Sequence, residues 1–169
     1  MLHPVEIDQG FALGGMEVRP FAISHDANEP SGFRIENGKK AVAVATDLGM
    51  YDGYTVENLK GLNGVVLEAN HDIHMLEVGP YPYPLKRRVM GDKGHLSNEW
   101  SGRLLCDILH DGLQYVVLGH LSKENNYAEL AYETVTTIKY GADKIAIEIK
   151  EDETLANTIN IIKKKINPA

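Results

Sequence analysis

Three residues that can bind a metal ion each follow a predicted strand. His25 comes after an alternating segment, and Asp47 and His120 each come after an apolar one. Imidazole nitrogen and carboxylate oxygen are ligands that Zn²⁺, Mn²⁺ and Fe²⁺ take from proteins. A carboxylate placed between two histidines can bridge two ions, which together activate water and hold a phosphate. Any one of the three residues could simply cap its strand, but their repeated placement at strand ends predicts a metal site.

The densest group of polar residues lies within residues 67–98. An apolar run ends there in Glu68, and His71, Asp72 and His95 follow. In α/β proteins, polar groups at the carboxyl ends of strands commonly form the active site. His95 comes just before a predicted helix, and free N–H groups at helix starts bind anions. This position suits a phosphate, although a histidine that caps its own helix fits the spacing equally well.

An alternation of strands and helices is predicted to position these residues. Strands are expected at residues 16–24, 32–36, 40–46, 64–69, 114–119 and 144–149. Helices are expected at residues 56–62, 96–109, 127–138 and 154–166. Asn37-Gly38 predicts a hairpin between the second and third strands, residues 80–84 predict a proline-rich turn, and Ser97 is expected to cap a helix. The third to fifth strands are apolar on both faces, which is typical of central strands covered on both sides.

The composition is that of an ordinary soluble globular protein, with 43% hydrophobic and 24% charged residues among 169. No apolar run approaches the ~20 residues that a membrane span needs. The N-terminus lacks the pattern of a secretory or mitochondrial signal. Cys106 is the single cysteine and cannot form an internal disulfide, which suits a reducing compartment. We therefore expect a cytoplasmic protein.

Charge sets limits on nucleic-acid binding. The formal net charge of −7 argues against broad nonspecific binding to nucleic acid. It leaves room for a local basic cluster, and Lys86-Arg87-Arg88 lies beside the predicted site. Trp100 could stack on a base, but packing in the core or at its rim is the simpler interpretation.

A set of segments carries a resemblance to a known family: SHDANEPSGFRI, VATDLG, LEANHDIHML, GPYPYPLKRRV, GHLSN and LGHLSKENN. Together they span about residues 10–140, and they resemble the YycJ/WalJ branch of the metallo-β-lactamase fold hydrolases. The resemblance implies an αββα sandwich with a di-metal site at one edge of its two sheets. It also implies exonuclease action on double-stranded DNA from the 5′ end, with two divalent ions, Mn²⁺ or Zn²⁺.

The resemblance implies a role for individual residues of this sequence. His25, Asp47 and His120 would be metal ligands, and Asp47 would bridge two ions. His95 would face the scissile phosphate as an acid or electrostatic stabiliser. Glu68 would orient a ligand or tune His95. The residues expected to bind substrate are His71, Asp72, Ser97, Asn98, Lys123 and Asn125.

One part of the family pattern is absent from this sequence. The HxHxDH motif supplies up to four ligands and the deprotonating aspartate in the family, and no histidine here has that spacing. The fold class is therefore expected to be α/β, the C-terminal half of an αββα sandwich, with residues 1–169 forming one partial domain. Loss of the other half would uncover one face of the apolar central strands.

Two classes of function follow. The first is a metal-dependent hydrolase, a phosphodiesterase or 5′–3′ exonuclease on double-stranded DNA that uses a di-metal-activated water. A related enzyme alternative acts on RNA or a small phosphoester. The second class is a catalytically incomplete half-domain. It would act only by pairing with a complementary N-terminal half or with another copy of itself.

Overall fold

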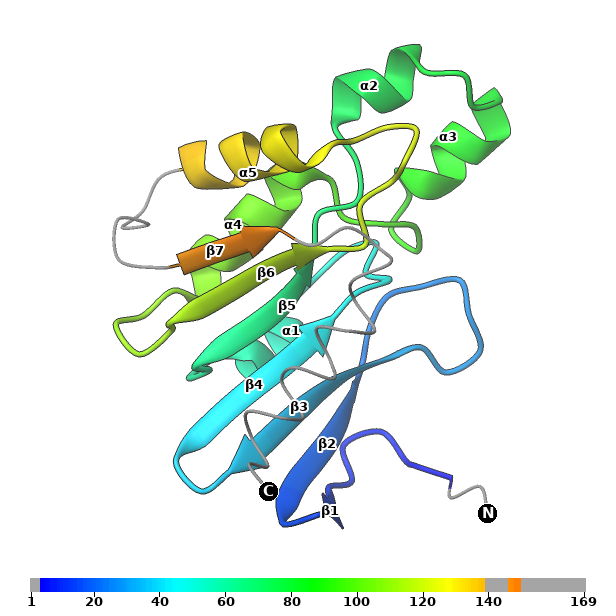
Figure 1. The fold of residues 1–169 in the computed structure, drawn as a ribbon. Helices are drawn as coiled ribbons and strands as arrows, with labels where there is room; N and C mark the ends of the chain where they lie inside the picture. The colour runs from blue at the N-terminus through cyan, green and yellow to red at the C-terminus, as the bar shows by residue number, and fades with distance from the viewer. Residues whose placement is uncertain (1–3, 139–145, 150–169) are drawn as a thin grey trace.

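A seven-stranded mixed sheet organises the chain in the computed structural model, which describes residues 4–138 and 146–149 (Figure 1). The strands lie in the sheet in chain order: β1 (Phe11–Leu13), β2 (Met16–Ala22), β3 (Ser31–Asn37), β4 (Lys40–Ala45), β5 (Gly64–Glu68), β6 (Tyr115–Gly119) and β7 (Ala146–Ile149). Strands β1 to β4 pair antiparallel, whereas β4 to β7 pair parallel. The parallel pairs need crossover connections, which helices provide up to β6. The predicted α/β class is confirmed.

Helices α1 (Gly53–Leu59) and α4 (Asn98–Ile108) lie behind the sheet in Figure 1, and α5 (Ala128–Thr137) packs beside α4. Two further helices, α2 (Ile73–Val78) and α3 (Tyr83–Val89), project beyond the carboxyl end of β5. Of the helices that the structure describes, none is long and apolar enough to cross a membrane.

Most predicted elements match observed ones within a few residues, and Ser97 caps α4 as expected by accepting a hydrogen bond from Trp100 N. The proline-rich turn predicted at residues 80–84 holds for Pro80 to Pro82, but Tyr83 and Pro84 begin α3 instead. Pro84 is tolerated there because the first turn of a helix requires no backbone N–H. Helix α2 and strand β1 were not predicted. The helix predicted at residues 154–166 lies outside the described residues.

One hydrophobic core fills the space between the sheet and the three covering helices. Alternate residues of β4, β5 and β6 point into it: Ala41, Ala43, Ala45, Val65, Leu67, Val116 and Leu118. The residues between them face the other way, and two of these, Val66 and Val117, are only 1% and 8% exposed. Val42 and Val44 of β4, by contrast, are half-buried. The uncovered apolar face expected for a half-sandwich is therefore wrong for β5 and β6, and for β4 it stays a prediction.

Backbone contacts join the loops after β2 and β4 to the segment before α4. Gly49 N donates to Ser24 O at 2.8 Å, and Ser24 Oγ donates to Asp92 O at 2.6 Å. There is no room for a side chain at Gly49, since an added Cβ would lie 2.4 Å from Gly94 N and 2.5 Å from Asp92 O. These contacts fix the relative positions of three segments: the loop after β2, the loop after β4 and the segment before α4, which carry His25, Asp47 and His95.

We expect Gly49→Ala to lower the free energy of unfolding by about 1–3 kcal/mol, because the new methyl group must push the loop backbones apart. Gly53→Ala is the matched control, since a Cβ there meets nothing within 4 Å. It should change stability by less than about 1 kcal/mol. Urea unfolding followed by circular dichroism measures both values, and equal losses would contradict the tight packing of these loops.

Candidate metal centre and adjoining cavities

The residues that follow β2, β4 and β6 bring two histidines to one carboxylate. Asp47 Oδ1 lies 3.7 Å from His25 Nε2 and 3.6 Å from His120 Nε2. Two ligand atoms bound to one ion at about 2.0–2.2 Å in tetrahedral geometry lie roughly 3.3–3.6 Å apart. The spacing therefore fits residues that share metal ions, with Asp47 in the middle.

Asp47 and His120 both have left-handed backbone conformations, with φ of 59° and 58°. A non-glycine residue in this region costs about 1–2 kcal/mol, and such strain collects at functional sites. Neighbouring hydrogen bonds hold both residues in place. Leu48 N, next to Asp47, donates to Glu68 Oε2 at 2.7 Å, and Asn70 Nδ2 donates to His120 O at 2.8 Å. The fold thus maintains this strain at two of the three predicted ligands.

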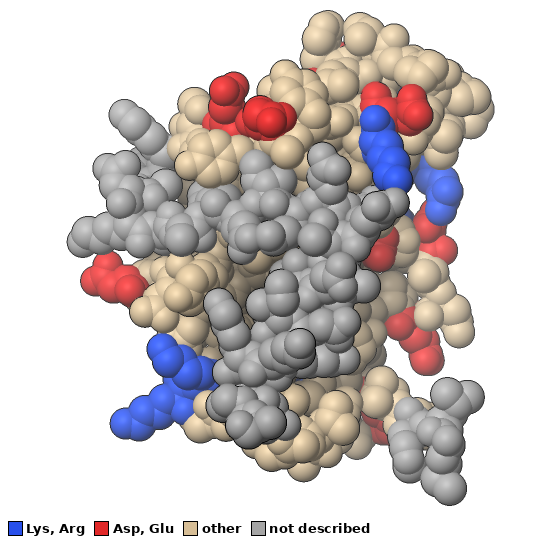
Figure 2. Space-filling model, viewed as in Figure 1, with Lys and Arg blue, Asp and Glu red and all other residues tan. Residues whose placement is uncertain are grey.

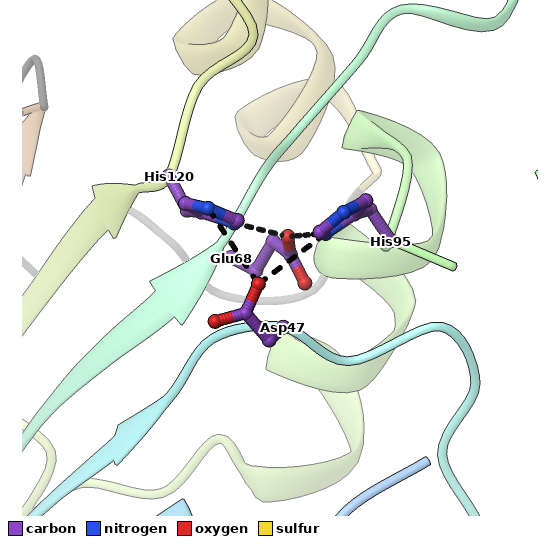
Figure 3. A group of neighbouring side chains, drawn as sticks. All are labelled: Asp47, Glu68, His95 and His120. Carbon is purple, nitrogen blue, oxygen red and sulfur yellow. Dashed lines mark hydrogen bonds and ion pairs between the residues drawn. The ribbon is translucent and has the colours of Figure 1, made fainter. Parts of the chain in front are cut away.

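Glu68 is a fully buried carboxylate that links two of the histidines (Figure 3). Its Oε1 accepts hydrogen bonds from His95 Nδ1 and His120 Nδ1, both at 2.7 Å. Burial alone would raise the pKa of Glu68, but the hydrogen bonds from His120 and His95 outweigh burial and hold the pKa below its usual value. The charged carboxylate fixes both rings with Nδ1 protonated, so Nε2 of each ring is left for other chemistry.

Four residues offer one ligand atom each within 4.8 Å of one another: Asp47, Glu68, His95 and His120. Glu68 differs from the others because it already accepts three hydrogen bonds, including the one from Leu48 N. With its lone pairs used in this way, Glu68 is suited to orient the ligands, the role that the family resemblance implies and that stays a prediction.

His25 joins the group through Asp47 and His95. Its Nδ1 lies 3.1 Å from Gly94 O, and since a carbonyl only accepts, Nδ1 carries the proton and Nε2 faces Asp47. The His25 and His95 rings have centroids 5.1 Å apart, and those of His95 and His120 are 5.0 Å apart. His25, Asp47, His95 and His120 therefore lie close together. The two imidazole nitrogens and the carboxylate fit Zn²⁺ or Mn²⁺, and they leave positions for further ligands.

A cavity of about 480 Å³ opens over this group. His25, Asp47, His95 and His120 line it, together with Tyr81, Leu85, Arg88, Ser122 and Lys123. Arg88 makes a two-point ion pair with Asp26, with Nε–Oδ2 and Nη2–Oδ1 distances of 2.5 and 3.0 Å. Glu124 lines it too, so the cavity combines the predicted metal ligands with two cationic side chains and one further carboxylate. Arg88 and Lys123 are the groups in it that could contact an anionic substrate.

A second cavity, of about 450 Å³, lies on the other side of His95. Its walls are largely apolar and aromatic: Met50, Tyr51, Ile73, Met90 and Trp100. His71 and Ser97, two of the residues predicted to bind substrate, also line it. Because His95 lines both cavities, they meet at the candidate metal centre.

The other residues predicted to bind substrate divide into two groups. Lys123 lines the first cavity. Asp72 accepts from Met75 N and caps α2, and Asn98 exchanges two buried hydrogen bonds with Asn126. Asn125 is also buried, at 1% exposed. Asp72, Asn98 and Asn125 line neither of these two cavities, and their substrate contacts stay a prediction.

Arg88 was not among the residues predicted to bind substrate, although it belongs to the basic cluster noted in the sequence. The sequence alone did not show which cation of this cluster, Lys86, Arg87 or Arg88, faces the site, because helix α3 was not predicted. In the structure Lys86 Nζ donates to Glu77 O, while Arg88 lines the first cavity.

Comparison with known proteins places these features in a wider group. A family model described as "Beta-lactamase superfamily domain" matches residues 1–136. Exodeoxyribonuclease YycJ of Bacillus anthracis is 38% identical over 126 residues, which is 75% of this chain and 48% of that protein. Exodeoxyribonuclease WalJ of Streptococcus pneumoniae is 33% identical over 157 residues, 92% of this chain and 58% of that protein. The chain thus spans about half the length of these relatives.

Solved structures support the fold. The metallo-β-lactamase fold protein YhfI from Bacillus subtilis aligns with a TM-score of 0.62 at 16% identity, covering 86% of this chain and 51% of that one. A diphosphatase of the PhnP family aligns with a TM-score of 0.55 at 19% identity, covering 89% and 46%. At these identities the likeness concerns the fold alone.

His71 has an environment that disfavours its charged form. Burial lowers the pKa of His71 from its usual 6.5 to about 4, although the charges of Glu68 and Asp72 oppose this change. Between these pH values the unfolded chain binds a proton at this position that the folded chain does not. Acidification from pH 6.5 to 4 should therefore reduce stability through His71, by about 3 kcal/mol at most.

We expect His71→Gln to remove this contribution, because an amide does not titrate, and so to weaken the pH dependence of unfolding. Urea unfolding at pH 7, 6 and 5 measures how the free energy of unfolding depends on pH. His74→Gln is the matched control, since His74 is exposed. An unaltered pH dependence in His71→Gln would contradict the assignment.

Glu68→Gln should weaken Mn²⁺ or Zn²⁺ binding by about 10–100-fold. The amide has a single acceptor oxygen, so it cannot accept from Leu48 N as well as from the two histidine Nδ1 atoms, and the negative charge that orients the histidines is lost. Asp47→Ala should weaken binding at least as much, since it removes the central ligand. Isothermal titration calorimetry measures the affinities, and circular dichroism checks folding. His74→Ala should bind as the unmodified chain does. Unchanged affinity in a folded Glu68→Gln variant would contradict the orienting role.

Proposed function

The chain belongs to the β-lactamase superfamily and has the metallo-β-lactamase fold, and on that premise we propose that it is a metal-dependent hydrolase that acts on phosphodiester bonds of DNA. The names of the YycJ and WalJ relatives support this over an association-only role, because both are exodeoxyribonucleases. Since the chain spans about half the length of these relatives, their activity, their DNA substrate and a 5′–3′ direction are carried over as proposals.

The observation that carries the proposal is the convergence of His25 and His120 on Asp47, with Nε2–Oδ1 distances of 3.7 and 3.6 Å. We infer that these three residues would hold divalent cations, Mn²⁺ or Zn²⁺, with Asp47 shared between two of them. Such cations supply Lewis-acid chemistry: they make water a nucleophile near neutral pH and neutralise charge on a phosphate.

His95 is the residue that we assign to the leaving group. Its Nδ1 donates to Glu68, so Nε2 is the nitrogen that can give a proton to a departing oxygen. The hydrogen bond to the buried carboxylate of Glu68 fixes the orientation of the ring for this step. His95 also lies beside the predicted ligands, 3.8 Å from Asp47 Oδ1 through Nδ1.

Phosphate recognition is assigned to the cations of the first cavity, Arg88 and Lys123. A planar guanidinium suits bidentate contact with phosphate oxygens, and Arg88 is already held by Asp26. Figure 2 shows acidic and basic side chains next to one another around the projection of α2 and α3. With a net charge of −7, binding by such a local group would favour a specific site over general attraction to nucleic acid.

The described residues contribute three predicted ligands, whereas two ions need more, so we expect this chain alone to hydrolyse DNA slowly. Joining it in cis to the HxHxDH-bearing segment of a relative should produce Mn²⁺-dependent digestion of duplex DNA from the 5′ end. Gel analysis of end-labelled duplexes measures it. In the joined protein, Asp47→Ala should abolish digestion, and Arg88→Ala should raise KM about 10-fold, equivalent to about 1.4 kcal/mol.

His74→Ala is the control for the joined protein and should digest normally. A joined protein that folds and binds Mn²⁺ but digests no DNA would overturn the proposed function. Full activity of the 169-residue chain alone, lost in Asp47→Ala, would show instead that its own ligands suffice.

A further inference from the structure

We propose that the second cavity binds the nucleobase of the terminal nucleotide of the substrate. This inference rests on the proposed function, because it treats that nucleotide as part of the DNA being digested. The cavity is lined chiefly by Met50, His71, Ile73, Met90, Ser97 and Trp100. Its volume of about 450 Å³ lies within the range of about 300–1,000 Å³ that is usual for small-molecule sites.

The rim of the second cavity is made of large apolar side chains that stay in contact with solvent. Met50, Met90 and Trp100 are 45%, 42% and 47% exposed. Their gathering around one opening indicates a surface that is covered when a ligand binds. The two faces of a nucleobase are apolar and would be buried between such walls.

Trp100 is held in position as a stacking surface. The guanidinium of Arg103 lies 4.6 Å from the centroid of the Trp100 ring, and Tyr51 meets the ring nearly edge-on, with centroids 6.1 Å apart and an interplanar angle of 77°. The Tyr51 hydroxyl in turn donates to Asp107 Oδ2 at 3.0 Å. A ring fixed before binding loses little freedom on stacking, and base–aromatic stacking is worth about 5- to 150-fold in affinity.

A polar group lies among these apolar walls. His71 is 2% exposed, and its Nδ1 is buried with no hydrogen-bond partner among the residues that the structure describes. Such a group is unfavourable unless a ligand satisfies it. Asn98 N donates to His71 O at 2.9 Å, which fixes the backbone behind the ring.

The edge of a nucleobase carries both donors and acceptors, and a neutral imidazole offers one of each. The low pKa of His71 keeps the ring neutral at pH 7. The second cavity therefore pairs apolar walls with a polar contact, as a flat heteroaromatic ring requires.

The position of the cavity identifies which base it would take. His95 lines both cavities, so a base in the second cavity belongs to a nucleotide whose phosphate lies at the candidate metal centre. In a duplex that base must leave its pair before it can enter, which is least costly at an end. A nuclease that works from an end meets this condition at every step.

Trp100 is the sole tryptophan, so its fluorescence reports on this cavity directly. The metal-free chain is titrated with dAMP, dGMP, dCMP and TMP, and separately with 2-deoxyribose 5-phosphate. We expect saturable quenching by nucleotides and none by the sugar phosphate. His71→Ala should weaken nucleotide binding about 10-fold, and His71→Gln should recover part of the loss. His74→Ala, at an exposed histidine, should bind normally.

Trp100→Ala provides a second test at an exposed position and should also lose about 10-fold in affinity by equilibrium dialysis with labelled dAMP. Equal quenching by the sugar phosphate, or unchanged binding in folded His71→Ala and Trp100→Ala, would overturn the inference. So would sedimentation showing that a second copy of the chain occupies the cavity and excludes nucleotides.

The assay separates the two proposals because it needs neither metal nor hydrolysis. Base binding without DNA digestion by the joined protein would overturn the proposed function alone. DNA digestion without base binding would overturn only this inference.

Discussion

The candidate metal centre depends on a negative charge that the fold buries completely. Glu68 has no exposed surface, and its carboxylate remains charged because two imidazole N–H groups and a backbone N–H donate to it. Leaving a buried charge with one partner fewer is strongly unfavourable, typically by about 3–5 kcal/mol. The same hydrogen bonds that make this burial tolerable fix the orientation of His95 and His120. Stability and chemistry are therefore coupled at one residue.

Around this carboxylate, loops that are distant in sequence hold one another. The loop after β2 meets the loop after β4 through Ser24 and Gly49, and it meets the segment before α4 through Asp92 and Gly94. Asp47 and His120 keep left-handed backbones within this arrangement. A site assembled from loops is thus made rigid by backbone contacts, with a glycine where no side chain fits.

The sequence predicted the positions of the candidate metal ligands better than the residues that line the cavities around them. Strand-end placement located His25, Asp47 and His120, because one alternating and two apolar segments were recognisable as strands. In the mixed sheet β2, β4 and β6 run in the same direction, so their ends lie at one edge. Helices α2 and α3 escaped because each has six or seven residues and prolines interrupt the segment. Without these helices, neither the position of Arg88 in the first cavity nor the second cavity, which Trp100 lines, could be predicted. The walls of a cavity depend on how elements pack, and the hydrophobic periodicity of the sequence does not show this packing. Val66 and Val117 show the same limit, because apolar strands do not reveal what covers them.

The order of the strands has a consequence for synthesis on the ribosome. Because the seven strands lie in the sheet in the order of the chain, each new strand meets an edge that has already emerged. His25 and Asp47 are made before Glu68, and His120 follows only with the end of β6. A nascent chain stalled before that point would carry the carboxylate without one of its two imidazole donors. Completion of the centre therefore coincides with the pairing of β6.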